Sequence, residues 1–309
     1  MKRSVSKVLL VLLLCLVPPA GALAGEKAGE RCISAEDQFS FAESYFARGE
    51  YYRAIGEYER LAHFFPDDAL VPAALFRIGE SYFKGEKYAE AEATLDDFLS
   101  RFPKDGRAAE ARMLLCECSL AQGDKDAGLS CLAGVAARSQ AEGATPATDA
   151  ALTRMGWVYA DSGDWPRAKD AFGRVSGQGR AAGGLDRVAE GLSRADEIPR
   201  KSPLLAGALS VVPGAGQLYV GRPRDALFAF LLNGALIWAA AESFRDGQDG
   251  LGLAVSLVGA GFYVGNIHGA VTSAEKYNRD AEKGFVRSLR TRIGLLPGGA
   301  SLSFTISLR

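Results

Sequence analysis

The residue types that usually carry out chemistry are few and widely separated in this sequence. There are two histidines, His63 and His268, and five cysteines. No HExxH, P-loop, GxSxG or His/Cys cluster with metal-ligand spacing is present. The adjacent acids Asp96 and Asp97 fall on a predicted helix face, where solvated charge is the ordinary interpretation. We therefore expect no enzymatic activity, no metal and no cofactor.

The composition excludes a nucleic-acid partner. The net charge is -1 and 24% of residues are charged, without the basic excess that phosphate binding requires. Charged residues are dense from Glu26 to Lys201 and sparse from Pro203 to Val271. This change predicts a polar exported domain followed by a membrane domain.

The first 24 residues read as a secretory signal peptide. Basic residues precede the apolar run Val8 to Val17, and Ala22-Leu23-Ala24 supplies the small residues that signal peptidase needs before Gly25. Lipidation would have to use Cys15 or Cys32, but neither follows a small residue. Export leaves four cysteines in a compartment that permits disulfides. Cys131 could reach Cys116 or Cys118 within one helical hairpin; free buried thiols are the alternative.

A helical repeat occupies the middle of the chain, over residues 25–198. Phe41 to Phe46 matches Ile78 to Phe83 in the order of small and large residues, and Pro66 and Pro103 end the two copies. The copies fall at about 35–68, 72–105, 109–142 and 149–182. Glycine is expected to end the first helix of each copy: Gly49, Gly85, Gly123 and Gly163.

This pattern resembles the tetratricopeptide repeat (TPR) family, most of all the periplasmic members. The resemblance implies stacked helical hairpins with a concave groove that binds protein segments. The alternative is that the groove aromatics pack against the next repeat. The outward positions of the first helices, which would line the groove, are Phe39, Glu43, Phe46, Phe76, Glu80, Phe83, Met113, Glu117, Leu120 and Trp157.

Three apolar stretches follow the repeats in residues 199–275. A capping helix at Leu185 to Ala195 precedes them. The second and third stretches, Ala226 to Ala241 and Leu251 to Val271, are long enough to span a bilayer. The first, Leu204 to Val220, is broken by proline and glycine, so either two or three spans are expected. Gly261, Gly265 and Gly269 would form a small-residue face for helix packing.

The segment from Pro213 to Gly221 carries a PGxGQxYxG signature. It resembles small bacterial membrane domains that are similar in appearance to TM2 domains and to uncharacterised families fused to periplasmic repeats. That resemblance implies a tight membrane-embedded turn and no biochemical activity. His268 needs a polar partner in the apolar region, and Asn266 or Asn233 could supply it. Residues 276–309 read as a basic tail, with an alternating strand or disordered end at Ser301 to Leu308.

We therefore predict an all-α protein, with a TPR solenoid followed by a membrane domain of two or three hydrophobic helices. The expected function is an envelope scaffold that binds proteins in the groove and takes no small-molecule substrate. Alternatives are a subunit of a membrane complex or transporter whose C-terminal helices are the active part, and a linker between envelope layers. The expected location is the bacterial envelope, with periplasmic repeats and helices in the inner membrane.

Overall fold

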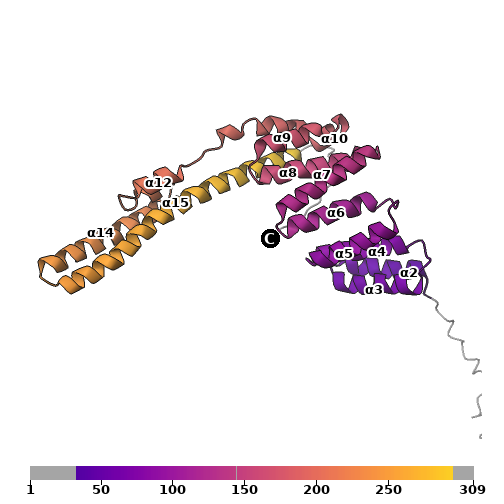
Figure 1. Cartoon of the computed structure of the whole chain (residues 1–309), viewed down its shortest axis with the longest axis horizontal. Coiled ribbons are helices and arrows are strands. Elements are labelled where there is room, and N and C mark those ends of the chain that lie inside the picture. Colours follow the sequence, from indigo (N-terminus) through magenta and orange to yellow (C-terminus); the bar gives the residue numbers. More distant parts are fainter. Residues whose placement is uncertain (1–32, 144, 295–309) are drawn as a thin grey trace, which may run out of the picture. The chain divides into compact units, whose positions relative to one another are not determined.

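The computed structural model describes residues 33–143 and 145–294, in which all regular structure is helical (Figure 1). The chain divides into two compact units, residues 1–81 and residues 82–309, with the boundary inside one helix. The predicted signal peptide (1–24), Cys32 and the terminal strand (301–308) lie outside the described residues.

The first unit holds the first repeat. Helices α2 (Ala35–Ala47) and α3 (Tyr51–Phe64) pack together, and α4 (Val71–Lys84) begins in this unit. Ser34 caps α2 through a reciprocal pair of hydrogen bonds with Asp37, which satisfies two backbone donors at the helix start. Tyr58 and Ala42 are fully buried, so the two helices are held by a large residue set against a small one.

The second unit continues the hairpins. Its helices are α5 (Tyr88–Arg101), α6 (Ala108–Ala121), α7 (Lys125–Ala141), α8 (Thr145–Asp161) and α9 (Trp165–Arg174). In the last hairpin a side chain at Gly156 would overlap the ring of Phe172. This glycine therefore permits the close approach of α8 and α9 that the repeat pattern requires.

Two short helices follow the last hairpin. They are α10 (Gly177–Gly183) and α11 (Leu185–Leu192), and a 3₁₀ turn at Ala195–Glu197 leads out of them. The predicted capping helix corresponds to α11. Its buried Leu185, Val188 and Leu192 join the core cluster of α8 and α9.

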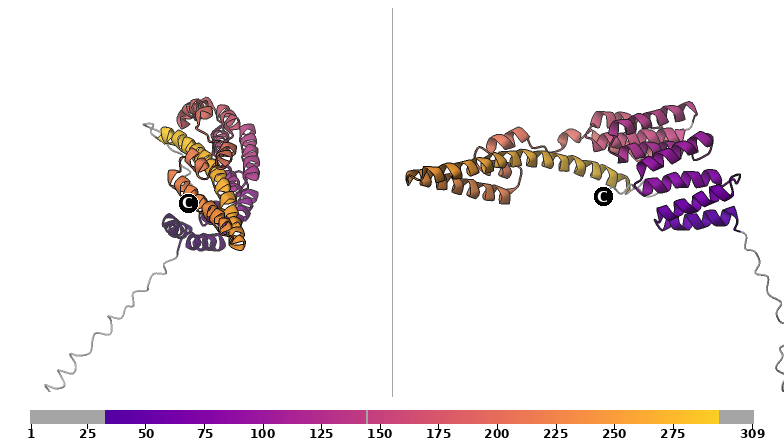
Figure 2. Two further views of the ribbon diagram at one scale, coloured as in Figure 1. Left: turned by 90° about the vertical axis from the view of Figure 1, so that its left-hand side faces the viewer. Right: turned by 60° about the horizontal axis from the view of Figure 1, so that its bottom comes forward.

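The apolar half contains two long helices. The first apolar stretch forms only α12 (Pro203–Leu209) and α13 (Ala215–Tyr219), which are too short to span a bilayer. Helices α14 (Pro223–Arg245) and α15 (Asp249–Gly294) form an antiparallel hairpin, with α12 beside α15 (Figure 2). Both long helices have the length and hydropathy of a membrane span.

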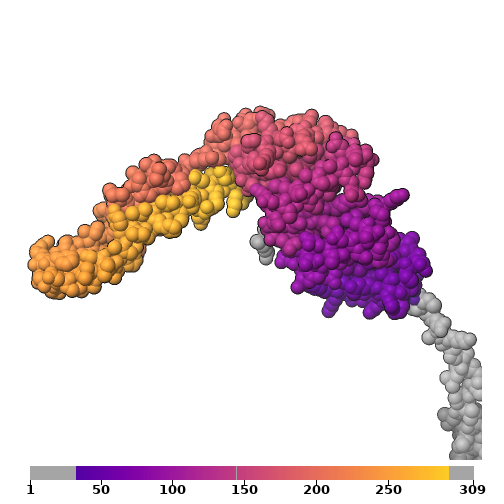
Figure 3. Space-filling view, viewed as in Figure 1, coloured from indigo at the N-terminus to yellow at the C-terminus, as the bar shows by residue number. Residues whose placement is uncertain are grey.

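No change of secondary structure marks residue 276, where the sequence pattern divides the membrane domain from the basic tail. Helix α15 runs through it without interruption as far as Gly294. The charged part of α15 packs against α8 and α11, as the yellow segment of Figure 3 shows beside the repeat surface. The sequence pattern missed this contact because the residues that make it lie among many charged ones.

The turn that follows the first helix of each repeat has the same left-handed backbone geometry in all four copies. The residue in that conformation is not the same in every copy. Gly49, Gly123 and Gly163 have φ of 76°, 88° and 74°, in the left-handed region. In the second repeat that conformation belongs to Glu86, with φ of 60°, and not to Gly85 as expected. A residue with a Cβ is strained in this region, whereas glycine is not.

We expect Glu86→Gly to stabilise the protein by about 1 kcal/mol because it removes this strain. Thermal unfolding of the full chain in detergent, followed by circular dichroism, measures the change. The neighbouring Lys87→Gly is the control, since Lys87 has an ordinary negative φ of -99° and should lose stability. A lower unfolding temperature for Glu86→Gly would contradict the prediction.

Candidate functional site

The candidate site is the set of first-helix positions that the repeat pattern directs outward. In the first unit, Arg77 joins two of its glutamates. Its guanidinium donates to Glu43 (Nε to Oε1, 2.8 Å) and to Glu80 (Nη1 to Oε2, 2.6 Å). The hydroxyl of Tyr58 also donates to Glu43 Oε1 at 2.5 Å. Burial and this hydrogen bond raise the pKa of Tyr58, so the hydroxyl stays protonated and keeps donating.

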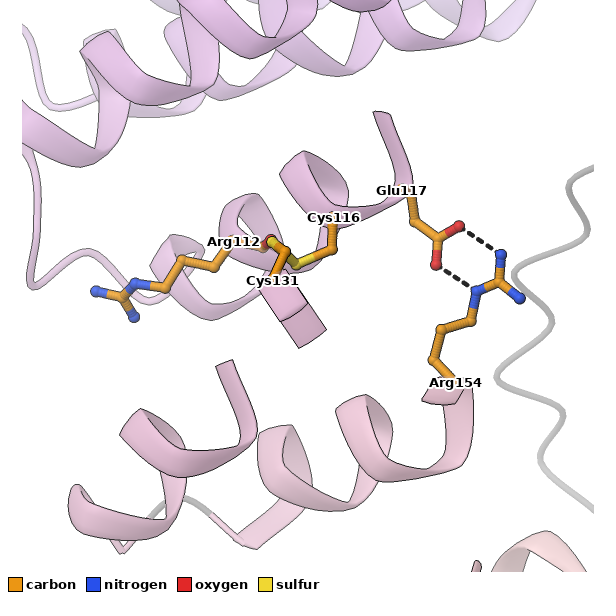
Figure 4. Close-up of a disulfide and its surroundings, with 5 residues drawn as sticks. All are labelled: Arg112, Cys116, Glu117, Cys131 and Arg154. Atoms are coloured by element: carbon orange, nitrogen blue, oxygen red, sulfur yellow. Dashed lines mark hydrogen bonds and ion pairs between the residues drawn. A yellow bond between two sulfur atoms is a disulfide. The ribbon is translucent and has the colours of Figure 1, made fainter. Parts of the chain in front are cut away.

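The glutamate of the third repeat is also paired. Arg154 of α8 makes a two-pronged ion pair with Glu117 of α6, one prong measuring 2.7 Å from Nη2 to Oε2 (Figure 4). Burial acts to lower the pKa of Arg154, but the hydrogen bond and charge of Glu117 outweigh it and raise that pKa. Glu117 is only 8% exposed. The prediction that it lines an open acidic groove is therefore wrong.

One sequence feature explains both pairs. Arg77 and Arg154 occupy the same repeat position, three residues before the outward position, and each reaches the glutamate of the preceding repeat. The third repeat has Leu114 there, so Glu80 pairs with Arg77 of its own helix instead. Glu43 and Glu117 thus serve as ion-pair links between consecutive repeats, and Glu80 pairs within its own helix, so the three do not form a stripe of unpaired carboxylates.

Most of the large apolar side chains that were predicted to line the groove also make contacts within the chain. Phe76 is 4% exposed and belongs to the core, which corrects its assignment to the groove. Phe39 contacts Tyr58 and Phe46 contacts Arg77 in the first unit. In the second unit Phe83 contacts Tyr88, while Met113 and Leu120 pack against the core cluster. Of the described residues from 82 to 200, no large apolar side chain is exposed.

Trp157, the groove residue of the fourth repeat, contacts the chain's own α15. The guanidinium of Arg290 lies 4.9 Å from the Trp157 ring and is 2.7 Å from the carboxylate of Asp161. Five residues earlier Phe285 meets Trp165 edge-on at 5.5 Å, and Leu289 is buried in the same cluster. The spacing of Phe285 and Leu289, one helical turn apart, was the available sequence signal for this docking.

A disulfide joins the two helices of the third hairpin. Cys116 of α6 and Cys131 of α7 are bonded, with their Cα atoms 5.3 Å apart (Figure 4). Cys118 is left as a buried thiol. Burial and the nearby charges of Glu92 and Glu117 raise the pKa of Cys118 to about 12, which keeps it protonated and poorly nucleophilic.

The PGxGQxYxG segment forms a compact turn against the long helices. Gly214, with φ of 89°, lies so close to α14 that a Cβ would strike the carbonyl of Ala226. A Cβ on Gly216 would strike α12 and Ala270 of α15. Gln217 Nε2 donates to the backbone carbonyl and the side-chain oxygen of Asn266, at 2.9 and 2.7 Å. Each of these signature residues thus has a packing or bonding role.

Two expectations for the membrane domain concern contacts that the described part of the chain does not make. Asn266 is engaged by Gln217 and Asn233 donates to the carbonyl of Ala229, so neither is recorded as a partner of the exposed His268. Gly261, Gly265 and Gly269 have open space where a Cβ would stand. Among the described residues no His, Cys, Asp and Glu cluster could hold a metal ion.

We expect Arg154→Met to destabilise the protein by about 2 kcal/mol, because it leaves the Glu117 carboxylate buried without its cation. Thermal unfolding of the full chain measures this. Adding Glu117→Gln should restore more than half of the loss. Arg101→Met, which breaks an exposed pair with Asp97, is the control and should cost less than about 0.5 kcal/mol. Equal effects of Arg154→Met and Arg101→Met would refute the buried link.

Comparisons with known proteins agree with the helical-hairpin geometry. The YfiO family profile, described as an outer membrane lipoprotein, matches residues 33–154, and a tetratricopeptide-repeat profile matches residues 150–178. No curated protein sequence matches the chain. Both profile matches end before the PGxGQxYxG segment.

Two of the solved structures that match the chain are repeat proteins of low sequence identity. A putative kinesin light chain with TPR-like repeats from Podosopora anserina is 14% identical, with a TM-score of 0.38, covering 67% of this chain and 95% of its own. A tetratricopeptide repeat protein from Parabacteroides merdae is 16% identical, with a TM-score of 0.40, covering 83% and 98%. The chain thus contains a tetratricopeptide repeat at residues 150–178, and its residues 33–154 are similar to the YfiO outer membrane lipoproteins.

Proposed function

We propose that this chain is a non-enzymatic scaffold of the bacterial envelope, anchored by the α14–α15 hairpin, that holds a protein partner on its first repeat. Tetratricopeptide repeats are protein-binding folds, and the similarity to an outer membrane lipoprotein family supports an envelope location. The observation that carries the proposal is the distribution of exposed apolar side chains over the described repeats.

Within the described repeat helices, exposed large apolar residues occur only in the first hairpin. Phe41 of α2 is 48% exposed, and Tyr52 and Phe64 of α3 are 59% and 66% exposed. Exposed apolar side chains that are grouped on one part of a protein often mark an interaction site, and aromatic ones are enriched at binding hot spots. Exposed Arg48 and Arg53 lie near the Tyr45 ring and share Glu50 as their ion-pair partner, which leaves one net positive charge beside these residues. A partner with an apolar segment and carboxylates fits this surface.

The anchor rests on length, hydropathy and exposure. Helix α14 has 23 residues, about 35 Å at 1.5 Å per residue, which is enough to cross a bilayer. Only 6% of its most apolar window is buried within the structure. Side chains such as Phe228 and Trp238, 70% and 67% exposed, would face lipid. Because a core helix of a soluble domain would be covered, this exposure favours a membrane-spanning role.

Two spans place both ends of the hairpin on the side of the repeats. The far end of α15 packs on α8 and α11, so it must share a compartment with them. The predicted export signal would put that compartment outside the cytoplasm, and helical spans favour the inner membrane. The positive-inside tendency opposes this arrangement, since the repeat side carries more basic residues than the α14–α15 turn. Topology mapping therefore tests the proposal directly.

The alternative function, a subunit of a membrane complex with active helices, has one observation in its favour. The side-chain oxygen of Gln217 is buried and has no hydrogen-bond donor within the described structure. A polar atom of this kind in a membrane segment is costly unless a second molecule supplies a donor. Loss of function in Gln217→Leu, with partner capture intact, would favour this alternative.

We expect Phe41→Ser/Phe64→Ser to abolish partner capture while the fold is kept, because both side chains are exposed. Crosslinking and pull-down from intact envelopes, compared with wild type by mass spectrometry, identifies a partner lost in the variant. The control is Lys104→Ser/Lys169→Ser, which changes exposed residues of later repeats. An unchanged partner set in the first-repeat variant would remove this surface from consideration.

For topology, we expect a cysteine at Gln248, in the α14–α15 turn, to be shielded from a membrane-impermeant maleimide in cells with a permeabilised outer membrane. A cysteine at Ser288, exposed near the far end of α15, should react in the same cells. Lysis should make both reactive. The reverse pattern would place the repeats in the cytoplasm, and equal labelling of both before lysis would refute the two-span anchor.

A further inference from the structure

A set of basic residues borders the apolar surface of the membrane domain at the end nearer the repeats. They come from three segments that are distant in sequence: the approach to α12, the start of α14 with its N-cap, and the middle of α15. We call this set the basic collar. It consists of Arg200, Lys201, Arg222, Arg224, Lys276 and Arg279.

Hydrogen bonds join the other two segments to α15. The side chain of Asn278 on α15 accepts from the backbone N–H of Lys201 at 2.7 Å and donates to its carbonyl at 2.8 Å. Arg222 Nη1 donates to the hydroxyl of Ser273 at 2.7 Å. The Lys201 ammonium lies 4.8 Å from the ring of Tyr219, which fixes its position beside α13. The three segments that carry the collar residues are therefore joined to one another through α15.

Half of this positive charge is not neutralised within the described chain. Arg222 pairs with Asp225 at 2.5 Å, Arg279 approaches Glu275 at 4.0 Å, and Arg200 pairs with Glu282. The structure records no ion pair for the other three members, Lys201, Arg224 and Lys276. At the opposite end of the hairpin the charges are mainly acidic, with Glu242, Asp246 and Asp249 around Arg245.

Apolar side chains adjoin the collar and face outward. Helices α12 and α13 do not span a bilayer, yet Leu204, Val211 and Leu218 are 84%, 64% and 62% exposed. Short helices that expose apolar residues beside basic ones are suited to the membrane interface, where acyl chains contact the former and headgroups the latter. A soluble anion would neutralise the charge but leave these side chains in water.

We infer that the basic collar binds the headgroups of anionic phospholipids, with α12 and α13 lying among the acyl chains of the same leaflet. A phospholipid supplies both the phosphate and the apolar chains that this surface requires. Bound anionic headgroups would also offset the unfavourable position of a basic helix end outside the cytoplasm. The inference rests on the proposed membrane anchor.

The test uses the full chain in nonionic detergent and phosphatidylglycerol labelled on its acyl chain, with binding followed by fluorescence anisotropy. Unlabelled phosphatidylglycerol should compete, whereas phosphatidylcholine and inorganic phosphate should not. Lys201→Gln/Arg224→Gln/Lys276→Gln should weaken binding roughly 100-fold, at about fivefold for each charge removed. The matched control, Lys104→Gln/Lys125→Gln/Lys169→Gln, removes three exposed charges from the repeats and should bind as wild type.

Three results would overturn the inference. These are equal competition by phosphatidylcholine, effective competition by inorganic phosphate, and unchanged affinity of the collar variant. Sedimentation of the chain with carbonate-washed membranes separates this failure from failure of the anchor. A chain that stays in the membranes but shows no lipid selectivity has lost only the collar inference, whereas a chain released by carbonate has lost the anchor.

Discussion

A repeat hairpin buries one apolar face against the next hairpin, so the last hairpin of an array leaves a face that water would otherwise contact. In this chain α11 and the far part of α15 cover that face, with Leu289 buried among residues of α8, α9 and α11. A side chain at Gly191 would overlap Leu289, which shows how closely α11 and α15 approach. Because α15 also forms the apolar hairpin with α14, one packing contact joins the repeats to the proposed anchor.

Close packing also explains the short broken helices beside that hairpin. A polar backbone turn in lipid is stable only where its carbonyls and amides are satisfied. Here Asn266 donates to the carbonyl of Ser210, and the Tyr263 hydroxyl donates to the carbonyl of Val211. Both carbonyls belong to the break between α12 and α13. Side chains of α15 therefore supply the hydrogen-bond donors that a continuous helix would provide there. The glycines of the segment matter because they let these donors come near enough.

The sequence predicted the parts that depend on local pattern and missed those that depend on long-range pairing. The hairpins followed from recurring small and large residues, and Gly156 against Phe172 behaves as that pattern requires. The all-helical fold is confirmed by the described residues. The open acidic groove was not found, because whether Glu117 is exposed depends on an arginine in the next repeat. The docking of α15 was missed for the same reason: Phe285 and Leu289 are too sparse to mark a buried face without the surface that receives them.

The continuity of α15 has a consequence for how the proposed scaffold could respond to its surroundings. From Asn266, which holds the membrane turn, to Leu289, which holds the last repeat, the helix rises about 35 Å at 1.5 Å per residue. The collar residues Lys276 and Arg279 lie between these two anchoring points. A headgroup bound at the collar therefore contacts the same helix that covers the end of the repeat array. Lipid binding at the collar and the stability of the last repeat are therefore coupled if α15 stays helical from Asn266 to Leu289.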